Sequence, residues 1–240
     1  MDVILRVENL WKTYGKISAL KGVSFEVKRG EIFALIGPNG AGKTTTLRII
    51  ATLLTPTDGR VEFMGYDLRK NPEKIREGIS YLPEEAGAYK NMTGIEYLKF
   101  MANFYAEGNE QVEEFVERAK KIADLGDRLK DKVGTYSKGM VRKLLLARAL
   151  MTKPKLAILD EPTSGLDVIN SLEIREIIRK FVEEGISVLL SSHNMLEIEF
   201  LSDRVAIINK GKILDIGTPQ ELKEKYSSKN LEEVFRRIVS

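Results

Sequence analysis

The stretch GPNGAGKTT, residues 37–45, follows the apolar run IFALI and precedes the helical pattern LRII at residues 47–50. The order G-x-x-x-x-G-K-[ST] between a strand and a helix is the pattern of a phosphate-binding loop. Glycine allows backbone conformations that other residues avoid, so several N–H groups can converge on phosphate oxygens, and the helix start adds partial positive charge. We expect Lys43 to reach the β- and γ-phosphates of a nucleotide and Thr44 to ligate Mg²⁺. The residues expected around the phosphates are Gly37, Pro38, Asn39, Gly40, Ala41, Gly42, Lys43, Thr44 and Thr45.

A second apolar run, LAIL at residues 156–159, ends in two carboxylates, Asp160 and Glu161. Asp160 suits a residue that holds Mg²⁺ through its water shell, and Glu161 is placed to accept a proton from an attacking water. A solvated strand end, capped by the turn at residues 162–165, is the alternative. The phosphate loop favours the catalytic interpretation, because both features belong to one type of nucleotide site.

The chain has one histidine, His193, which follows the run ISVLL at residues 186–190 and two serines. In open parallel sheets, ligands lie beyond the carboxyl ends of the strands. The phosphate loop, the acidic pair and His193 each follow a buried strand pattern, so we expect them to converge on one crevice. An imidazole there can hydrogen-bond the γ-phosphate and the attacking water, whereas a surface histidine is the alternative.

Composition narrows the class of protein. The 240 residues are 43% apolar and 30% charged, which suits a globular chain with a sizeable core. Cysteine is absent, which excludes disulfides and argues against a transition-metal site. The 38 basic residues nearly match 35 acidic ones, so the charge does not indicate a nucleic-acid partner. No stretch is long and apolar enough to span a bilayer and no secretory signal is visible, so we expect an intracellular protein.

Strand and helix patterns occupy different parts of the chain. Alternation at residues 3–7, 23–27 and 61–63 predicts strands before about residue 82, and the apolar runs predict further strands after residue 155. Between them the period becomes helical, with one face made of Val112, Phe115, Val116, Ala119, Ile122 and Ala123. Further helices are predicted over about residues 137–151 and 170–183, with two short ones within 219–238. The pattern indicates an α/β core interrupted by a helical insert.

At this point the sequence closely resembles the ATP-binding subunits of ABC transporters. The resemblance spans nearly the whole chain and is carried by four stretches: GEIFALIGPNGAGKTTTLRIIATLL, YSKGMVRKLLLARAL, LAILDEPTSGLD and SSHNMLEIEFLSDRVAIINKGKILDIGTPQEL. It implies a P-loop NTPase fold of the α/β class, with a mostly parallel core sheet, an N-terminal antiparallel β subdomain and an inserted α-helical subdomain. We expect one domain over residues 1–240: a core at about 1–83 and 155–215, helices at about 84–154 and C-terminal helices at about 216–240.

The resemblance also implies roles for residues outside the phosphate loop. Tyr14 would stack on adenine, although a core or surface aromatic is the alternative. Asp167 matches the loop that crosses to a second subunit. Ser137 and Gly139 lie in the signature, usually LSGGQ, and would grip the γ-phosphate bound to the opposite subunit; a plain helix cap at Ser137 is the alternative. Two chains would then sandwich two ATP molecules, which implies a second ATPase subunit. A homodimer would complete both sites, because this chain has Glu161, His193 and a usable signature, and pairing with a different ATPase subunit is the alternative.

Two departures from the family pattern qualify this assignment. Lys138 and Met140 replace the usual Gly and Gln of the signature. Glu84 stands where most members carry the Gln that touches Mg²⁺ and the attacking water, so its role is either metal contact or membership of the coupling loop. Both changes are similar to the export-type branch that pairs with ABC-2-like membrane subunits. The segment after Glu84, through Met92 and Thr93, would touch that subunit.

The favoured hypothesis is a Mg²⁺-dependent ATPase that powers a transporter, with Lys43, Glu161 and His193 as catalytic residues and Thr44, Asp160 and Glu84 as metal contacts. It would lie at the cytoplasmic face of the cell membrane as a peripheral subunit of an integral membrane permease. An ABC ATPase of a soluble iron–sulfur assembly is the first alternative. The second is a GTP-dependent switch, because residues 209–212, NKGK, resemble the guanine-reading NKxD, although Lys212 replaces the required Asp.

Overall fold

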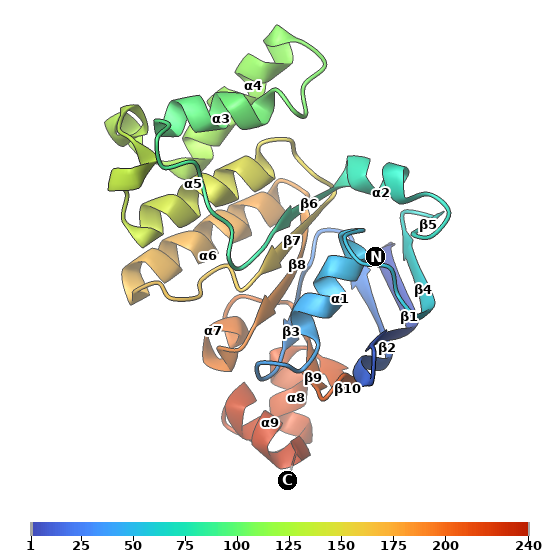
Figure 1. Cartoon of the computed structure of the whole chain (residues 1–240). Helices are drawn as coiled ribbons and strands as arrows, with labels where there is room; N and C mark the ends of the chain where they lie inside the picture. Colours follow the sequence, from blue (N-terminus) through green and yellow to red (C-terminus); the bar gives the residue numbers. More distant parts are fainter. Residues whose placement is uncertain (1, 240) are drawn as a thin grey trace.

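The computed structural model describes residues 2–239, which form two β-sheets and layers of helices around them (Figure 1). The core sheet has six strands in the order β10-β9-β3-β8-β7-β6, and all neighbours are parallel except β9 and β10. Its strands are β3 (Ile32–Ile36), β6 (Ile79–Leu82), β7 (Leu156–Asp160), β8 (Ser187–Ser192), β9 (Arg204–Asn209) and β10 (Lys212–Gly217). The expected mostly parallel core sheet is confirmed.

The second sheet is antiparallel and lies at the N-terminal side of the molecule. Its order is β2-β1-β4-β5. The strands are β1 (Val3–Tyr14), β2 (Ile17–Lys28), β4 (Asp58–Phe63) and β5 (Tyr66–Asp67). The alternation seen in the sequence at residues 3–7 and 23–27 thus continues into two strands of twelve residues each, which form a long hairpin.

The helices differ in which sheet face they cover. Helix α1 (Lys43–Ile50) lies between the two sheets, and α2 (Pro72–Gly78) precedes β6 (Figure 1). On the other face of the core sheet lie α3 (Gly94–Ala102), α4 (Asn109–Ala123), α5 (Lys138–Leu150) and α6 (Val168–Glu183), with the 3-10 helices η1 (Gly126–Lys130) and η2 (Val133–Thr135). Helices α7 (Met195–Glu199), α8 (Pro219–Lys225) and α9 (Leu231–Val239) complete the described chain.

Strand β3 explains why its sequence is continuously apolar. Phe33 and Leu35 face a core cluster shared with the antiparallel sheet and α1, where the rings of Phe25 and Phe33 stack with centroids 5.2 Å apart. Ile32, Ala34 and Ile36 face a second cluster shared with the helices. A strand that is buried on both faces carries no alternation, so the run IFALI places this strand in the centre of the molecule.

Helix starts in the structure follow capping chemistry. The predicted helix over 170–183 begins two residues earlier, at Val168, because the Asp167 side chain caps it by accepting from the Asn170 N–H at 2.9 Å. The two short C-terminal helices are confirmed, and Thr218 caps the first of them through a capping box. Within residues 2–239, no helix has the length and apolar character needed to cross a membrane.

Candidate active site

The phosphate loop connects the end of β3 to the start of α1, as the motif requires. Gly40 and Gly42 have φ of +77° and +111°, which side chains rarely adopt, and Gly42 is the residue that precedes the helix. The first turn of α1 contains no acidic residue. A cavity of about 270 Å³ opens over the loop and is lined by Ala19, residues 38–45, Glu84 and Glu161. Free helical N–H groups without a nearby helix carboxylate suit an anion such as phosphate.

Lys43 is buried inside this loop. Its Nζ donates to the carbonyl oxygens of Gly37 at 2.7 Å and Pro38 at 3.3 Å, and it lies 3.3 Å from Glu161 Oε1. The ammonium is therefore held between the loop and the end of β7 by two carbonyls and one carboxylate. This arrangement places a cation at the cavity where phosphate oxygens would bind, as the motif predicts.

Glu161 lies at the bottom of the cavity in a left-handed backbone conformation, with φ of +49°. Its N–H lies 3.2 Å from the Ser191 carbonyl and 3.1 Å from Ser191 Oγ, so the end of β8 holds the end of β7. The carboxylate Oε2 lies 2.9 Å from His193 Nδ1 and accepts from the His193 N–H at 3.3 Å. Oε1 is buried without a hydrogen-bond partner, although the Lys43 ammonium is close. A buried carboxylate with an unfilled acceptor beside a histidine is suited to receive a proton.

Asp160 is held by three hydroxyl groups. Thr44 Oγ1 donates to Oδ1 at 3.2 Å, Ser191 Oγ donates to the same oxygen at 2.5 Å, and Tyr81 OH donates to Oδ2 at 3.3 Å. Burial, and then the Asp160 charge, raise the pKa of Tyr81 to about 12, so the phenol remains a donor. Tyr81 and Ser191 were missed in the sequence because each lies within a strand whose neighbours only the fold defines.

Thr44 and Asp160 at the phosphate loop suit a Mg²⁺ ion that is bound together with a nucleotide. Within the described residues no group of three or more His, Cys, Asp or Glu side chains could hold a metal ion by itself. Thr44 and Asp160 supply one hydroxyl and one carboxylate side by side. Mg²⁺ commonly takes one or two carboxylates and completes its octahedron with waters and substrate phosphates, so this donor set matches it.

Glu84 follows β6 and lines the cavity together with the phosphate loop. Its Oε1 accepts from Ser164 Oγ at 3.2 Å, and its carbonyl accepts from Arg142 Nη2 at 3.0 Å. Burial lowers the pKa of the Arg142 guanidinium, and the Glu84 charge opposes that shift. Glu84 thus connects Ser164, in the turn that follows β7, to Arg142 of α5, and it also lines the cavity.

Six of the predicted site residues lie outside the cavity lining: Tyr14, Gly37, Ser137, Gly139, Asp160 and His193. Asp160 and His193 are nevertheless hydrogen-bonded to the lining residues Thr44 and Glu161. Tyr14 ends β1 with a half-exposed ring, and the Lys12 Nζ lies 5.0 Å from its centroid. Ser137 caps α5 by accepting from the Met140 N–H at 3.2 Å. Gly139 packs so closely on α6 that an added Cβ would lie 1.9 Å from Asn170 Oδ1.

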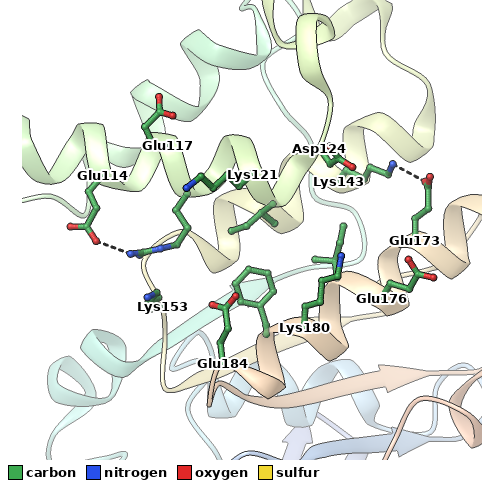
Figure 2. A pocket seen from close by; sticks show the side chains of 14 residues that line it. Glu114, Glu117, Lys121, Asp124, Lys143, Lys153, Glu173, Glu176, Lys180 and Glu184 are labelled. Carbon is green, nitrogen blue, oxygen red and sulfur yellow. Dashed lines mark hydrogen bonds and ion pairs between the residues drawn. The ribbon is translucent and has the colours of Figure 1, made fainter.

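A larger cavity, of about 800 Å³, lies between α4 and α6 and contains none of the predicted site residues (Figure 2). Its walls carry both signs of charge, including Lys121, Lys180, Glu176 and Glu184, over an apolar floor. The phosphate cavity is smaller, yet it brings together Lys43, Glu161 and Glu84, so chemistry rather than size marks it as the candidate active site.

Comparison with known proteins agrees with this geometry. Residues 20–164 match the ABC transporter family. This chain belongs to the ABC transporter family. The linearmycin resistance ATP-binding protein LnrL of Bacillus subtilis is 39% identical over 219 residues, which cover 91% of this chain and 70% of that protein. The lantibiotic transport ATP-binding protein SrtF of Streptococcus pyogenes is 37% identical, covering 98% and 97% of the two chains. The solved structure of the ATP-binding subunit of an ABC transporter has a TM-score of 0.86 at 31% identity, covering 99% of this chain and all of that one.

Within the ABC transporter family the chain is an ATP-binding subunit with ATPase activity, and the P-loop NTPase fold expected from the sequence is confirmed. The relatives named above are resistance and transport proteins. Nothing in the site or in these relatives favours the iron–sulfur assembly alternative.

Proposed function

We propose that this chain is the ATP-hydrolysing subunit of an ABC exporter and works as a homodimer on the cytoplasmic face of the membrane, bound to an integral membrane permease. The names of the relatives, which concern linearmycin resistance and lantibiotic transport, support export. One observation supports the proposed homodimer. The cavity collects Lys43, Glu161 and Glu84, and Asp160 and His193 are hydrogen-bonded to its lining residues Thr44 and Glu161. The signature residues Ser137 and Gly139 instead lie outside it, against Met140 and Asn170, which suggests that one chain supplies half of each site.

The surface beside the signature supports a second copy as the missing half. Val168, Ile169 and Leu172 are exposed on the first turns of α6, next to Asn170, which packs against Gly139. Apolar side chains clustered on a surface mark a contact that removes them from water. A second chain placed over this surface would cover these side chains and bring its own phosphate loop to the signature helix.

The residues of the cavity divide the work of hydrolysis. Lys43, with the N–H groups of the loop and Ser137 and Gly139 of the opposite chain, would stabilise charge on the γ-phosphate oxygens. A water oxygen would form the new bond to the γ-phosphorus as the bond to the β–γ bridging oxygen breaks, releasing ADP and phosphate. Glu161 would accept the proton of that water, and His193 would orient the water and the γ-phosphate.

Thr44 and Asp160, with Glu84 also lining the cavity, would hold Mg²⁺, which would neutralise charge on the phosphates. Tyr14 would stack on the adenine at the mouth of the site, where its half-exposed ring leaves one face accessible.

The permease contact is proposed for the loop of residues 84–93 and the adjoining face of α3. Tyr89, Phe100 and Phe104 are exposed there, and their rings meet edge to face with centroids 5.6 Å and 5.0 Å apart. Residues 84–154 would act as one helical subdomain. The core at about 1–83 and 155–215 would carry it, and the helices at 216–240 would follow. Movement of α5 on ATP binding would be transmitted to the permease through this subdomain.

The test is ATP hydrolysis by the purified chain over a range of protein concentrations, with Glu161→Gln as the inactive control. We expect specific activity to rise with concentration, because each site needs two chains. Glu161→Gln should lower kcat roughly 10²- to 10⁴-fold while the chain still binds ATP and dimerises. Glu113→Gln, an exposed acid of α4, is the matched change that should leave the rate unaltered. A rate per chain independent of concentration would contradict the shared site.

A further inference from the structure

The turn between β9 and β10, Lys210-Gly211, is the segment that resembled a guanine-reading motif, and the structure gives it a different place. It lies against the phosphate loop and against β2, far from both in sequence. Gly211 N–H donates to the Ala41 carbonyl at 2.9 Å, and Lys21 N–H donates to the Gly211 carbonyl at 2.8 Å. One residue therefore joins the loop to the antiparallel sheet through its two backbone groups.

The backbones approach closely here because glycines, which have no side chain, occupy the contact positions. An added Cβ at Gly211 would lie 2.6 Å from the Ala19 carbonyl oxygen, and one at Gly42 would lie 3.0 Å from the same oxygen. On the other side of the loop, a Cβ at Gly37 would lie 2.1 Å from the Ile208 carbonyl oxygen. The loop is thus enclosed by the backbones of β2 and of the end of β9, and no side chain could be inserted between them without displacement.

We propose that Gly211 is a positioning residue for ATP binding: its turn braces the phosphate loop and fixes the directions of the N–H groups that receive the phosphates. The proposal rests on the assignment of residues 37–45 as the ATP phosphate site. The brace acts through the backbone atoms of Gly211 and does not use the side chains of Asn209 and Lys212. Ala41, buried and tied at its carbonyl, is the point at which the brace reaches the loop.

The chain offers a matched control for this role. The turn Met64-Gly65 between β4 and β5 has the same two-residue geometry, with φ of +50° and +84°, against +47° and +79° for Lys210 and Gly211. Both positions favour glycine for the same backbone reason. An added Cβ at Gly65 meets nothing within 4 Å, so Gly65→Ala introduces the strain of a side chain without the collision.

The experiment compares ATP affinity, measured by calorimetry, for Gly211→Ala and Gly65→Ala, together with thermal stability. We expect Gly211→Ala to weaken ATP binding about tenfold, or about 1.4 kcal/mol, and Gly65→Ala to leave it unchanged. Gly211→Ala should also lose more stability than Gly65→Ala, because only the former adds a collision to the backbone strain that both share. The KM for ATP should rise with the affinity loss while kcat at saturating ATP changes little. Asn209→Ala and Lys212→Ala should bind ATP as the unaltered chain does.

Equal ATP affinities for the two glycine variants would overturn the brace. Lys43→Ala distinguishes failure of the brace from a wrong assignment of the ATP site. If Lys43→Ala also binds ATP normally, the assignment of residues 37–45 as the phosphate site fails. Amide hydrogen exchange on the unaltered chain tests the brace independently of whether a variant folds. ATP should slow exchange of the Gly211 N–H and leave that of Gly65 unchanged, and no change at Gly211 would contradict the proposal.

Discussion

The buried pair formed by Lys43 and Glu161 allows one prediction to be worked out from the structure. Without nucleotide, we expect the two side chains to stabilise the fold jointly. The perturbation is Lys43→Met and Glu161→Gln, each alone and together, which forms a double-mutant cycle. Removal of one partner leaves the other charge buried with incomplete compensation, whereas removal of both leaves no such charge.

The magnitude follows from distance and burial. Lys43 Nζ and Glu161 Oε1 are 3.3 Å apart, and both side chains are 6% exposed. At an effective dielectric constant of about 20 the Coulomb attraction at this distance is about 5 kcal/mol, and loss of hydration offsets part of it. Lys43 keeps its two carbonyl acceptors, and Glu161 keeps His193. We therefore expect each single change to cost about 3 kcal/mol, with a coupling of about 2 kcal/mol between them.

Urea unfolding of the four proteins without nucleotide measures this coupling. The control cycle is Lys74→Met and Glu77→Gln, because that pair has an Nζ–Oε1 distance of 3.1 Å but side chains 55% and 64% exposed. Exposed pairs contribute little, so the control coupling should be within error of zero. A coupling for Lys43 and Glu161 no larger than that of the control would refute the argument that burial of the pair, rather than its separation, determines its strength.

Two further changes test other parts of the molecule. Burial would raise the pKa of Asp215, but hydrogen bonds led by those from Lys225 and Tyr226 outweigh it and lower the pKa below the ordinary 3.8. Asp215→Asn should therefore lower the free energy of unfolding by about 1 kcal/mol at neutral pH. Measured by unfolding at several pH values, this loss should disappear as the pH falls from 3.8 through the pKa of Asp215 in the folded protein. A loss that persists in acid would exclude this cause. Gly139→Ala should displace Asn170 and lower the ATPase rate about a hundredfold, while a single chain keeps its ATP affinity. Parallel assays of rate and ATP binding measure the two effects. An unchanged rate would contradict a role of Gly139 in the site of the opposite chain.

Local sequence was a good guide wherever an element depends on its own residues. The strand–loop–helix of the phosphate loop, the strand ends at Asp160 and His193, and the α4 face were all predicted from spacing. The extent of the long hairpin was underestimated, because residues such as Trp11 and Tyr14 pair across to β2 without a clear alternation. The start of α6 was predicted two residues late because the cap by Asp167, rather than apolar period, decides it.

The sequence by itself determined that this chain carries a phosphate-loop motif and a buried strand that ends in two carboxylates, because glycine spacing and apolar runs are properties of short segments. Only the tertiary structure decided that Lys43 pairs with Glu161, that Tyr81 holds Asp160, and that Gly211 supports the loop from the far end of the chain. These contacts join residues between 79 and 170 positions apart. Their geometry follows from how parallel strands are ordered and how closely two backbones can approach, neither of which any local pattern records.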